Sequence, residues 1–149
     1  MRKKITIFFV CLSVLVVPSS SAEEKFISLK KSKVNVRYGP SFESKIKYIY
    51  KKINLPVKQI DQKDNFSRII DLKNNSGWIH VSQFKKSNSI IVLEDKILFK
   101  KSSRLSMPIA RIEKGRLLLI SKCENKWCNI TTNGHSGWVN VENIWGSIK

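Results

Sequence analysis

The chain has 149 residues, of which 28 are Lys or Arg and 11 are Asp or Glu, for a formal net charge of +17. This excess favours anionic partners or surfaces, although the many Lys, Asn and Ile residues also fit A/T-rich codons and an ordinary solvated face. With only three Cys and two His, the composition gives little support to a structural zinc site, which usually needs four ligands.

The first residues have the order of a secretory signal peptide. Residues 2–4 are basic, residues 5–17 are apolar, and small residues from Pro18 to Ala22 suit a signal peptidase. The apolar run falls short of the ~20 residues that span a bilayer, which disfavours an uncleaved anchor. We therefore expect a signal peptide of residues 1–22 and a periplasmic or secreted chain without a transmembrane segment. Cleavage of this peptide would remove three basic residues, so the mature chain would have 25 basic and 11 acidic residues and a net charge of +14.

One sequence motif, called the shared phrase below, occurs twice in the rest of the chain. NNSGWIHVSQF and GHSGWVNVENI share a Ser-Gly-Trp core followed by a β-branched residue, a polar residue and Val. Such self-similarity is the signature of a structural repeat. We therefore predict two modules, residues 23–85 and residues 88–149, joined by a short coil over Lys85 to Ser87.

Apolar positions extend the repeat upstream of the shared phrase. Aligned without a gap, Val34, Val36, Ile46 and Ile49 fall on Ile97, Phe99, Ile109 and Ile112. The same alignment places Lys101 at the position of Tyr38. Small shifts then bring Val57 and Phe66 onto Leu118 and Trp127. Loops absorb such shifts of one or two residues.

Each module is predicted to consist of short strands separated by turn residues. In the first module the expected strands are residues 26–29, 34–37, 55–60, 66–70 and 77–81, with 46–50 either a strand or a helical turn. In the second they are residues 90–93, 97–99, 117–122, 127–131 and 138–141. Asn133-Gly134 is a hairpin-type turn. No stretch has a helix-length amphipathic pattern, so we expect an all-β chain of two small, strongly bent barrels.

Large aromatic residues are expected to matter in barrels with so little core. Trp78, Trp127 and Trp138 are predicted to supply much of the buried apolar area. Gly77 and Gly137 each directly precede a Trp, which indicates a β-bulge or a close backbone approach. The shared phrase is thus interpreted as structural.

Two cysteines remain after Cys11 leaves with the signal peptide. Cys123 and Cys128 enclose a four-residue turn between two alternating runs. In an oxidising compartment such a pair indicates a disulfide, and antiparallel strands would place the two residues opposite each other. The alternative is a reactive thiol pair, which the neighbouring Lys122 and Lys126 would favour.

Several ordered motifs together resemble a known family. They are Val34-Asn35-Val36-Arg37, Gly39-Pro40, Leu55-Pro56-Val57, Gly77-Trp78-Ile79-His80, Cys123 to Trp127-Cys128, Gly137-Trp138-Val139 and Trp145-Gly146. The set resembles bacterial SH3-like (SH3b) domains, and in particular a tandem SH3-like family of exported proteins from α-proteobacteria. The chain departs from that pattern at Asn54 and Phe66, where Gly and Trp are usual. The resemblance implies a noncatalytic role, commonly attachment to cell-wall peptides or envelope proteins.

Candidate ligand-binding residues cluster in the first module. They are Arg37, Tyr38, Gly39, Pro40 and Phe42 in one loop, together with Tyr48 and Tyr50. In SH3-like barrels, similar loops and aromatic residues form a peptide groove. Tyr48 and Tyr50 should share one face if their segment is extended, and an ordinary place in the barrel is an equal alternative. Arg37 could instead donate a structural hydrogen bond to a loop carbonyl.

No catalytic constellation is visible in the sequence. His80 and His135 lack an evident carboxylate partner, and nucleophile-elbow, zincin and phosphate-loop motifs are missing from the sequence. Asp61, Asp64 and Asp71 occur in turn-like stretches typical of solvated loops. We therefore expect a noncatalytic protein without cofactor or metal, which binds peptidoglycan peptide or an envelope protein. The alternative is a cationic protein that binds anionic lipid or lipopolysaccharide; nucleic acid is disfavoured by the signal peptide.

Overall fold

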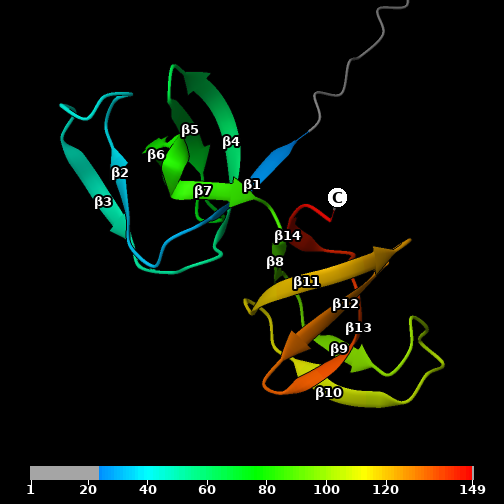
Figure 1. Ribbon diagram of the computed structural model, residues 1–149. Coiled ribbons are helices and arrows are strands. Elements are labelled where there is room, and N and C mark those ends of the chain that lie inside the picture. Colours follow the sequence, from blue (N-terminus) through cyan, green and yellow to red (C-terminus); the bar gives the residue numbers. More distant parts are fainter. Residues whose placement is uncertain (1–23, 149) are drawn as a thin grey trace, which may run out of the picture.

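The computed structural model describes residues 24–148, so the predicted signal peptide lies outside the described part of the chain. Two antiparallel sheets of seven strands each form two small barrels, one after the other along the chain (Figure 1). Among the described residues, no helix is long and apolar enough to cross a membrane. The predicted all-β fold with two tandem SH3-like domains is confirmed.

The two barrels contain the following elements. The first comprises β1 (Lys25–Leu29), β2 (Val34–Arg37), β3 (Ile46–Tyr50), β4 (Pro56–Lys63), β5 (Phe66–Ile70), β6 (Ser76–His80), the 3-10 turn η1 (Val81–Gln83) and β7 (Phe84–Lys86). The second comprises β8 (Ser89–Val92), β9 (Lys96–Phe99), β10 (Pro108–Ile112), β11 (Leu117–Glu124), β12 (Trp127–Thr132), β13 (His135–Asn140) and β14 (Ile144–Gly146). The segment 46–50, left open between strand and helical turn, is a strand.

Strand order repeats between the barrels. The first sheet has the order β3-β2-β6-β5-β4-β1-β7, and the second has β10-β9-β13-β12-β11-β8-β14, so each strand has a counterpart seven strands later. The last strand of the first barrel includes Lys85 and Lys86, which were expected to be coil. Only Ser87 and Asn88 therefore link the two sheets.

The gap-free alignment of the two modules is wrong by one residue around β9. Arg37 pairs with Trp78 in the first barrel, and Phe99 pairs with Trp138 in the second, so Phe99 corresponds to Arg37. The turn between β8 and β9 is one residue shorter than its counterpart between β1 and β2. A slip of one residue moves every side chain to the other face of a strand. Leu98 is accordingly buried, whereas Ile97 is 41% exposed.

Both cores are aliphatic, and the expectation that tryptophans supply much of the core area is wrong. The first core contains Ile27, Leu29, Val34, Val36, Val57, Ile69 and Ile79; the second contains Ile90, Val92, Leu98, Ile112, Leu118, Cys128, Ile130, Val139 and Val141. Gly77 and Ile79 face inward along β6, and side chains alternate along a strand. Trp78 and Trp138 are therefore on the outer face, where they and Trp127 are half-buried.

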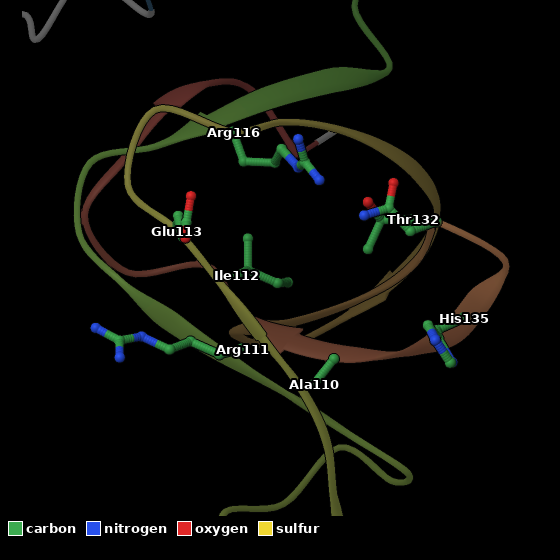
Figure 2. Close-up of a pocket in the computed structure, with 8 residues that line it drawn as sticks. Ala110, Arg111, Ile112, Glu113, Arg116, Thr132 and His135 are labelled. Carbon is green, nitrogen blue, oxygen red and sulfur yellow. The ribbon is translucent and has the colours of Figure 1, made fainter.

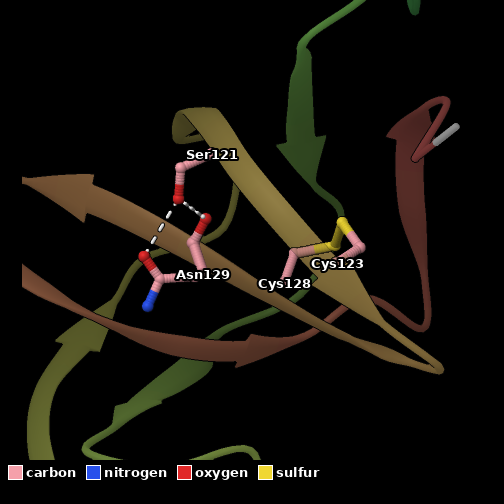
Figure 3. Close-up of a disulfide and its surroundings, with 4 residues drawn as sticks. All are labelled: Ser121, Cys123, Cys128 and Asn129. Atoms are coloured by element: carbon pink, nitrogen blue, oxygen red, sulfur yellow. Dashed lines mark hydrogen bonds between the residues drawn. A yellow bond between two sulfur atoms is a disulfide. The ribbon is translucent and has the colours of Figure 1, made fainter.

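The predicted disulfide between Cys123 and Cys128 is present. The two residues are directly opposite each other in the β11–β12 hairpin, with Cα atoms 4.1 Å apart (Figure 3). Cys128 belongs to the second core, so the bridge ties the hairpin to buried structure. On the same hairpin, the Ser121 hydroxyl donates to the Asn129 carbonyl at 2.9 Å. This second tie is exposed and lies near the register shift after Ile120.

Side chains from both barrels meet at the junction between them. The Trp145 Nε1–H donates to the Pro56 carbonyl at 2.9 Å, and the Trp145 ring contacts Phe26 edge-on at 5.1 Å. A second contact between the barrels joins the buried hydroxyls of Ser28 in β1 and Ser89 in β8, which are 2.6 Å apart. Buried polar groups that are hydrogen-bonded define a single geometry. These contacts hold the barrels in one relative orientation.

Candidate functional site

A basic hollow opens on the outer face of the first barrel. It has a volume of about 250 Å³ and is lined by Arg37, Tyr38, Lys47, Arg68, Ser76, Gly77 and Trp78. These residues come from β2, β3, β5, β6 and the loop after β2. The lining contains three cationic side chains, two aromatic rings and no carboxylate. Such a surface suits an anionic group attached to an apolar or planar body.

Arg37 holds the loop that borders this hollow. Its Nη1–H donates to the carbonyls of Phe42 and Ser44 at 2.9 and 2.7 Å. The structural alternative considered for Arg37, a hydrogen bond to a loop carbonyl, is thus observed. Gly39 lies in this loop beside Ser44; a Cβ at position 39 would be 2.7 Å from the Ser44 hydroxyl, a contact that rotation of the serine side chain can relieve. Pro40 lies in the same loop.

Tyr38 and Lys47 form the exposed rim of the hollow. The Tyr38 ring is 65% exposed, and the Lys47 ammonium lies 5.6 Å from its centroid. Lys47 also donates to the Ser76 carbonyl at 2.8 Å, which fixes the ammonium over the hollow. A ring held open to solvent beside a cation is available to pack on a ligand.

Phe42 points to a neighbouring aromatic cluster and does not line the hollow. Its ring lies 5.2 Å from Phe66 and 4.9 Å from His80. Phe66 and His80 are cross-strand partners in β5 and β6, and His80 Nδ1 accepts the Ser82 backbone N–H at 3.3 Å. Sequence reasoning missed this cluster, because its members are separated by long stretches of chain.

Tyr48 and Tyr50 face the barrel interior and lie apart from the residues of the hollow. Their rings share one face of β3, with hydroxyls 3.4 Å apart. The Tyr50 hydroxyl donates to Asp71 Oδ2 at 2.9 Å. Burial, and then the hydrogen bonds with Tyr48 and Asp71, raise the pKa of Tyr50 far above its ordinary value. Both rings therefore act as neutral packing groups.

The expectation that Asp71 sits in a solvated loop is wrong. The residue is only 9% exposed. Its Oδ1 accepts the backbone N–H groups of Lys73 and Asn75, each at 2.9 Å. A buried carboxylate needs such partners. Asp71 thus organises the turn before β6 and anchors Tyr50.

The second barrel has a hollow where the first has its tyrosines. The hollow measures about 280 Å³ and is lined by Ala110, Arg111, Ile112, Glu113, Arg116, Thr132, Asn133 and His135 (Figure 2). By strand pairing, Ala110 and Ile112 replace Tyr48 and Tyr50. Arg111 turns away from this space and pairs with Asp95 at 2.5 Å. With Glu113 in its lining, the second hollow has mixed charge, unlike the basic hollow.

The two histidines and two cysteines of the described chain are dispersed. His80 lies on the first barrel and His135 on the second, while the cysteine sulfurs are bonded to each other. Within residues 24–148, no group of three or more His, Cys, Asp or Glu side chains could hold a metal ion.

Comparison with known proteins identifies the second barrel. Residues 98–146 match the family model of the bacterial SH3 domain. The chain therefore carries a bacterial SH3 domain. The first barrel has the same strand order as this bacterial SH3 domain, so the chain is a tandem of SH3-like barrels. No curated protein matches the chain.

Solved structures that are similar to the chain include two NlpC proteins from Trichomonas vaginalis. NlpC2 is 11% identical, with 84% of this chain and 49% of that protein covered at a TM-score of 0.38. NlpC1 is 14% identical, with 92% and 51% covered at a TM-score of 0.38. The chain spans about half the length of each of these proteins.

Proposed function

We propose that the chain is an exported, noncatalytic binding protein of the cell envelope. In this proposal the basic hollow of the first barrel holds a carboxylate-bearing peptide, from peptidoglycan or from an envelope protein. Bacterial SH3 domains commonly bind the cell wall. The observation that carries the proposal is the hollow itself, with three cations and two aromatic rings at one site.

The chemistry of the hollow matches such a ligand. A carboxylate can accept hydrogen bonds from Arg68 and Lys47, and charge-assisted hydrogen bonds are stronger than neutral ones. Tyr38 and Trp78 offer flat apolar surface to the adjoining peptide backbone or side chain. A small ligand bound this way would be fixed at both its charged and its apolar parts.

Export is tested by the N-terminus of the native protein. We expect mass spectrometry of protein isolated from its source cells to show a chain that begins at Glu23, because residues 1–22 have the order of a cleavable signal. Fractionation should recover this form outside the cytoplasm. A native chain that still carries Met1 would contradict the prediction.

The binding site is tested by a matched pair of substitutions. Strand pairing and the loop hydrogen bonds place Lys100, and not Lys101, at the position of Tyr38. We expect Tyr38→Ala to weaken binding to purified, protein-free peptidoglycan by about fivefold, since an aromatic contact is worth about 1 kcal/mol. Lys100→Ala should leave binding within about twofold.

Co-sedimentation with peptidoglycan at low and high salt measures both variants. Binding in a shaped hollow should persist as salt rises, whereas attraction by charge alone should fall steeply. Equal losses from Tyr38→Ala and Lys100→Ala, with melting curves unchanged, would contradict a site confined to the first barrel.

A further inference from the structure

The loop between β9 and β10 exposes the most open apolar side chains of the second barrel. We call residues 100–107 the second-barrel loop. Leu105 at its tip is 98% exposed, and Met107 is 67% exposed. Figure 1 shows this loop projecting from the end of the molecule opposite to the loop that joins β2 and β3. An apolar tip of this kind lies far from the basic hollow.

Hydrogen bonds within the loop keep Leu105 exposed. The side chain of Ser103 turns back to accept the Leu105 N–H at 3.2 Å, and that of Ser106 accepts the Lys101 N–H at 2.9 Å. The Lys100 N–H closes the loop on the Met107 carbonyl at 2.9 Å. Polar side chains thus point into the loop and satisfy its backbone, and the apolar ones point out.

The corresponding loop of the first barrel shows that this arrangement is not needed for folding. Its backbone bonds follow the same pattern, with Tyr38 N–H donating to Lys45. Glu43 occupies the position of Leu105, because each donates its N–H to the serine two residues earlier. The same loop therefore forms with a charged residue at its tip.

Positive charge surrounds the apolar tip. Lys100, Lys101 and Arg104 belong to the loop, and no Asp or Glu occurs from residue 96 to residue 112. In the described chain, the ion pairs include neither Lys100 nor Lys101. Arg104 makes only a long contact of 3.5 Å with Glu142 and stays exposed. The loop therefore offers apolar groups beside two lysines, Lys100 and Lys101, that form no ion pair among the described residues.

We propose that the second-barrel loop docks on the surface of an anionic lipid bilayer, with Leu105 and Met107 inserted among the lipids. A bilayer supplies both things that the loop lacks, an apolar medium for two side chains and negative charge for the lysines around them. A narrow tip also suits a deformable lipid surface. This site is independent of the basic hollow and would leave the first barrel facing away from the membrane.

The proposal is tested with the chain from Glu23 onward and sedimenting vesicles. Vesicles of equal parts phosphatidylglycerol and phosphatidylcholine should bind it, and pure phosphatidylcholine should not. Leu105→Ser keeps the charge and should weaken binding about tenfold, by removing one buried aliphatic side chain. Changing both Lys100 and Lys101 to Gln should weaken vesicle binding about thirtyfold.

Ile53→Ser is the matched control. Ile53 is 49% exposed and follows Lys51 and Lys52, so it is an apolar residue beside two cations on the other barrel. It should leave vesicle binding within about twofold. Equal losses from Leu105→Ser and Ile53→Ser, unchanged binding by Leu105→Ser, or no binding to anionic vesicles would each overturn the proposal.

Two further measurements separate this site from others. Leu105→Ser should leave the melting curve and peptidoglycan binding unchanged. The proposal of lipid docking and the proposal of ligand binding in the basic hollow can therefore be contradicted independently of each other. Capture of an envelope protein in detergent that depends on Leu105, with no vesicle binding, would overturn lipid docking in favour of a protein partner.

Discussion

Reduction of the Cys123–Cys128 disulfide is expected to lower the melting temperature of the second barrel by about 15 °C. The bridge closes a loop with a sequence separation of 5, and a loop this short gives roughly 2 kcal/mol by the chain-entropy relation. In a domain of about 60 residues, that energy corresponds to a shift of this size. It is a large share of the stability of so small a domain.

Hydrogen exchange in each barrel, with and without reductant, measures this effect. Amides of β11 and β12 should lose protection on reduction, while those of β4 and β5 should change little, because residues 24–86 contain no cysteine. The double variant Cys123→Ala, Cys128→Ala should behave like the reduced protein. Labelling of two free thiols in the unreduced, denatured chain would show that the bridge is missing.

Gly137→Ala is expected to destabilise the second barrel by about 3 kcal/mol, at the upper end of the usual cost of overpacking. A Cβ on residue 137 would be 2.6 Å from the Phe99 carbonyl oxygen and 3.0 Å from Leu98 Cγ. The first of these is backbone of the neighbouring strand and cannot rotate away, so the β9–β13 pair must separate. Glycine is therefore required here for close approach of two strands.

Gly77→Ala tests the same feature in the first barrel. A Cβ on residue 77 would overlap Val36 Cγ1 and would be 3.0 Å from the Arg37 carbonyl oxygen. A methyl group can shift more easily than a backbone oxygen, so we expect a smaller cost of about 2 kcal/mol.

Chemical denaturation measures both glycine variants against Ser76→Ala and Ser136→Ala, which change the residue directly before each glycine. The serine variants should cost less than about 0.5 kcal/mol. Glycine variants that are no less stable than their serine neighbours would contradict the close approach of the strands.

The repeated phrase predicted two barrels because each barrel uses the same strand, β6 or β13, at the same place. The pairing around β9 could not be predicted, since Ile97, Leu98 and Phe99 are all apolar and either face could have been the inner one. The structure instead buries Lys96, which is 8% exposed, at the position of Val34. Its ammonium reaches Glu94 at 2.7 Å, and a lysine stem can cover apolar surface in this way.

The candidate site was predictable only where its residues are neighbours in sequence. Arg37 and Tyr38 were found because they share a loop. Lys47 and Arg68 were missed, and Trp78 was interpreted as structural only, because these residues join the hollow through strand pairing, such as the pair between Arg68 and Trp78. Periodicity along one strand carries no information on which residue of another strand lies beside it.

The junction at Trp145 also sets an order of events during folding. Trp145 and Pro56 are separated by 89 residues, and Ser28 and Ser89 by 61. Contacts between residues so far apart form late, because the intervening chain must first be ordered. Each barrel, β14 included, can complete its own core before the Trp145 side chain docks on Pro56 of the first barrel. In a molecule that has not yet formed this contact, both barrels are folded but the distance between them varies. The distance between the two loops at opposite ends of the molecule is therefore fixed last.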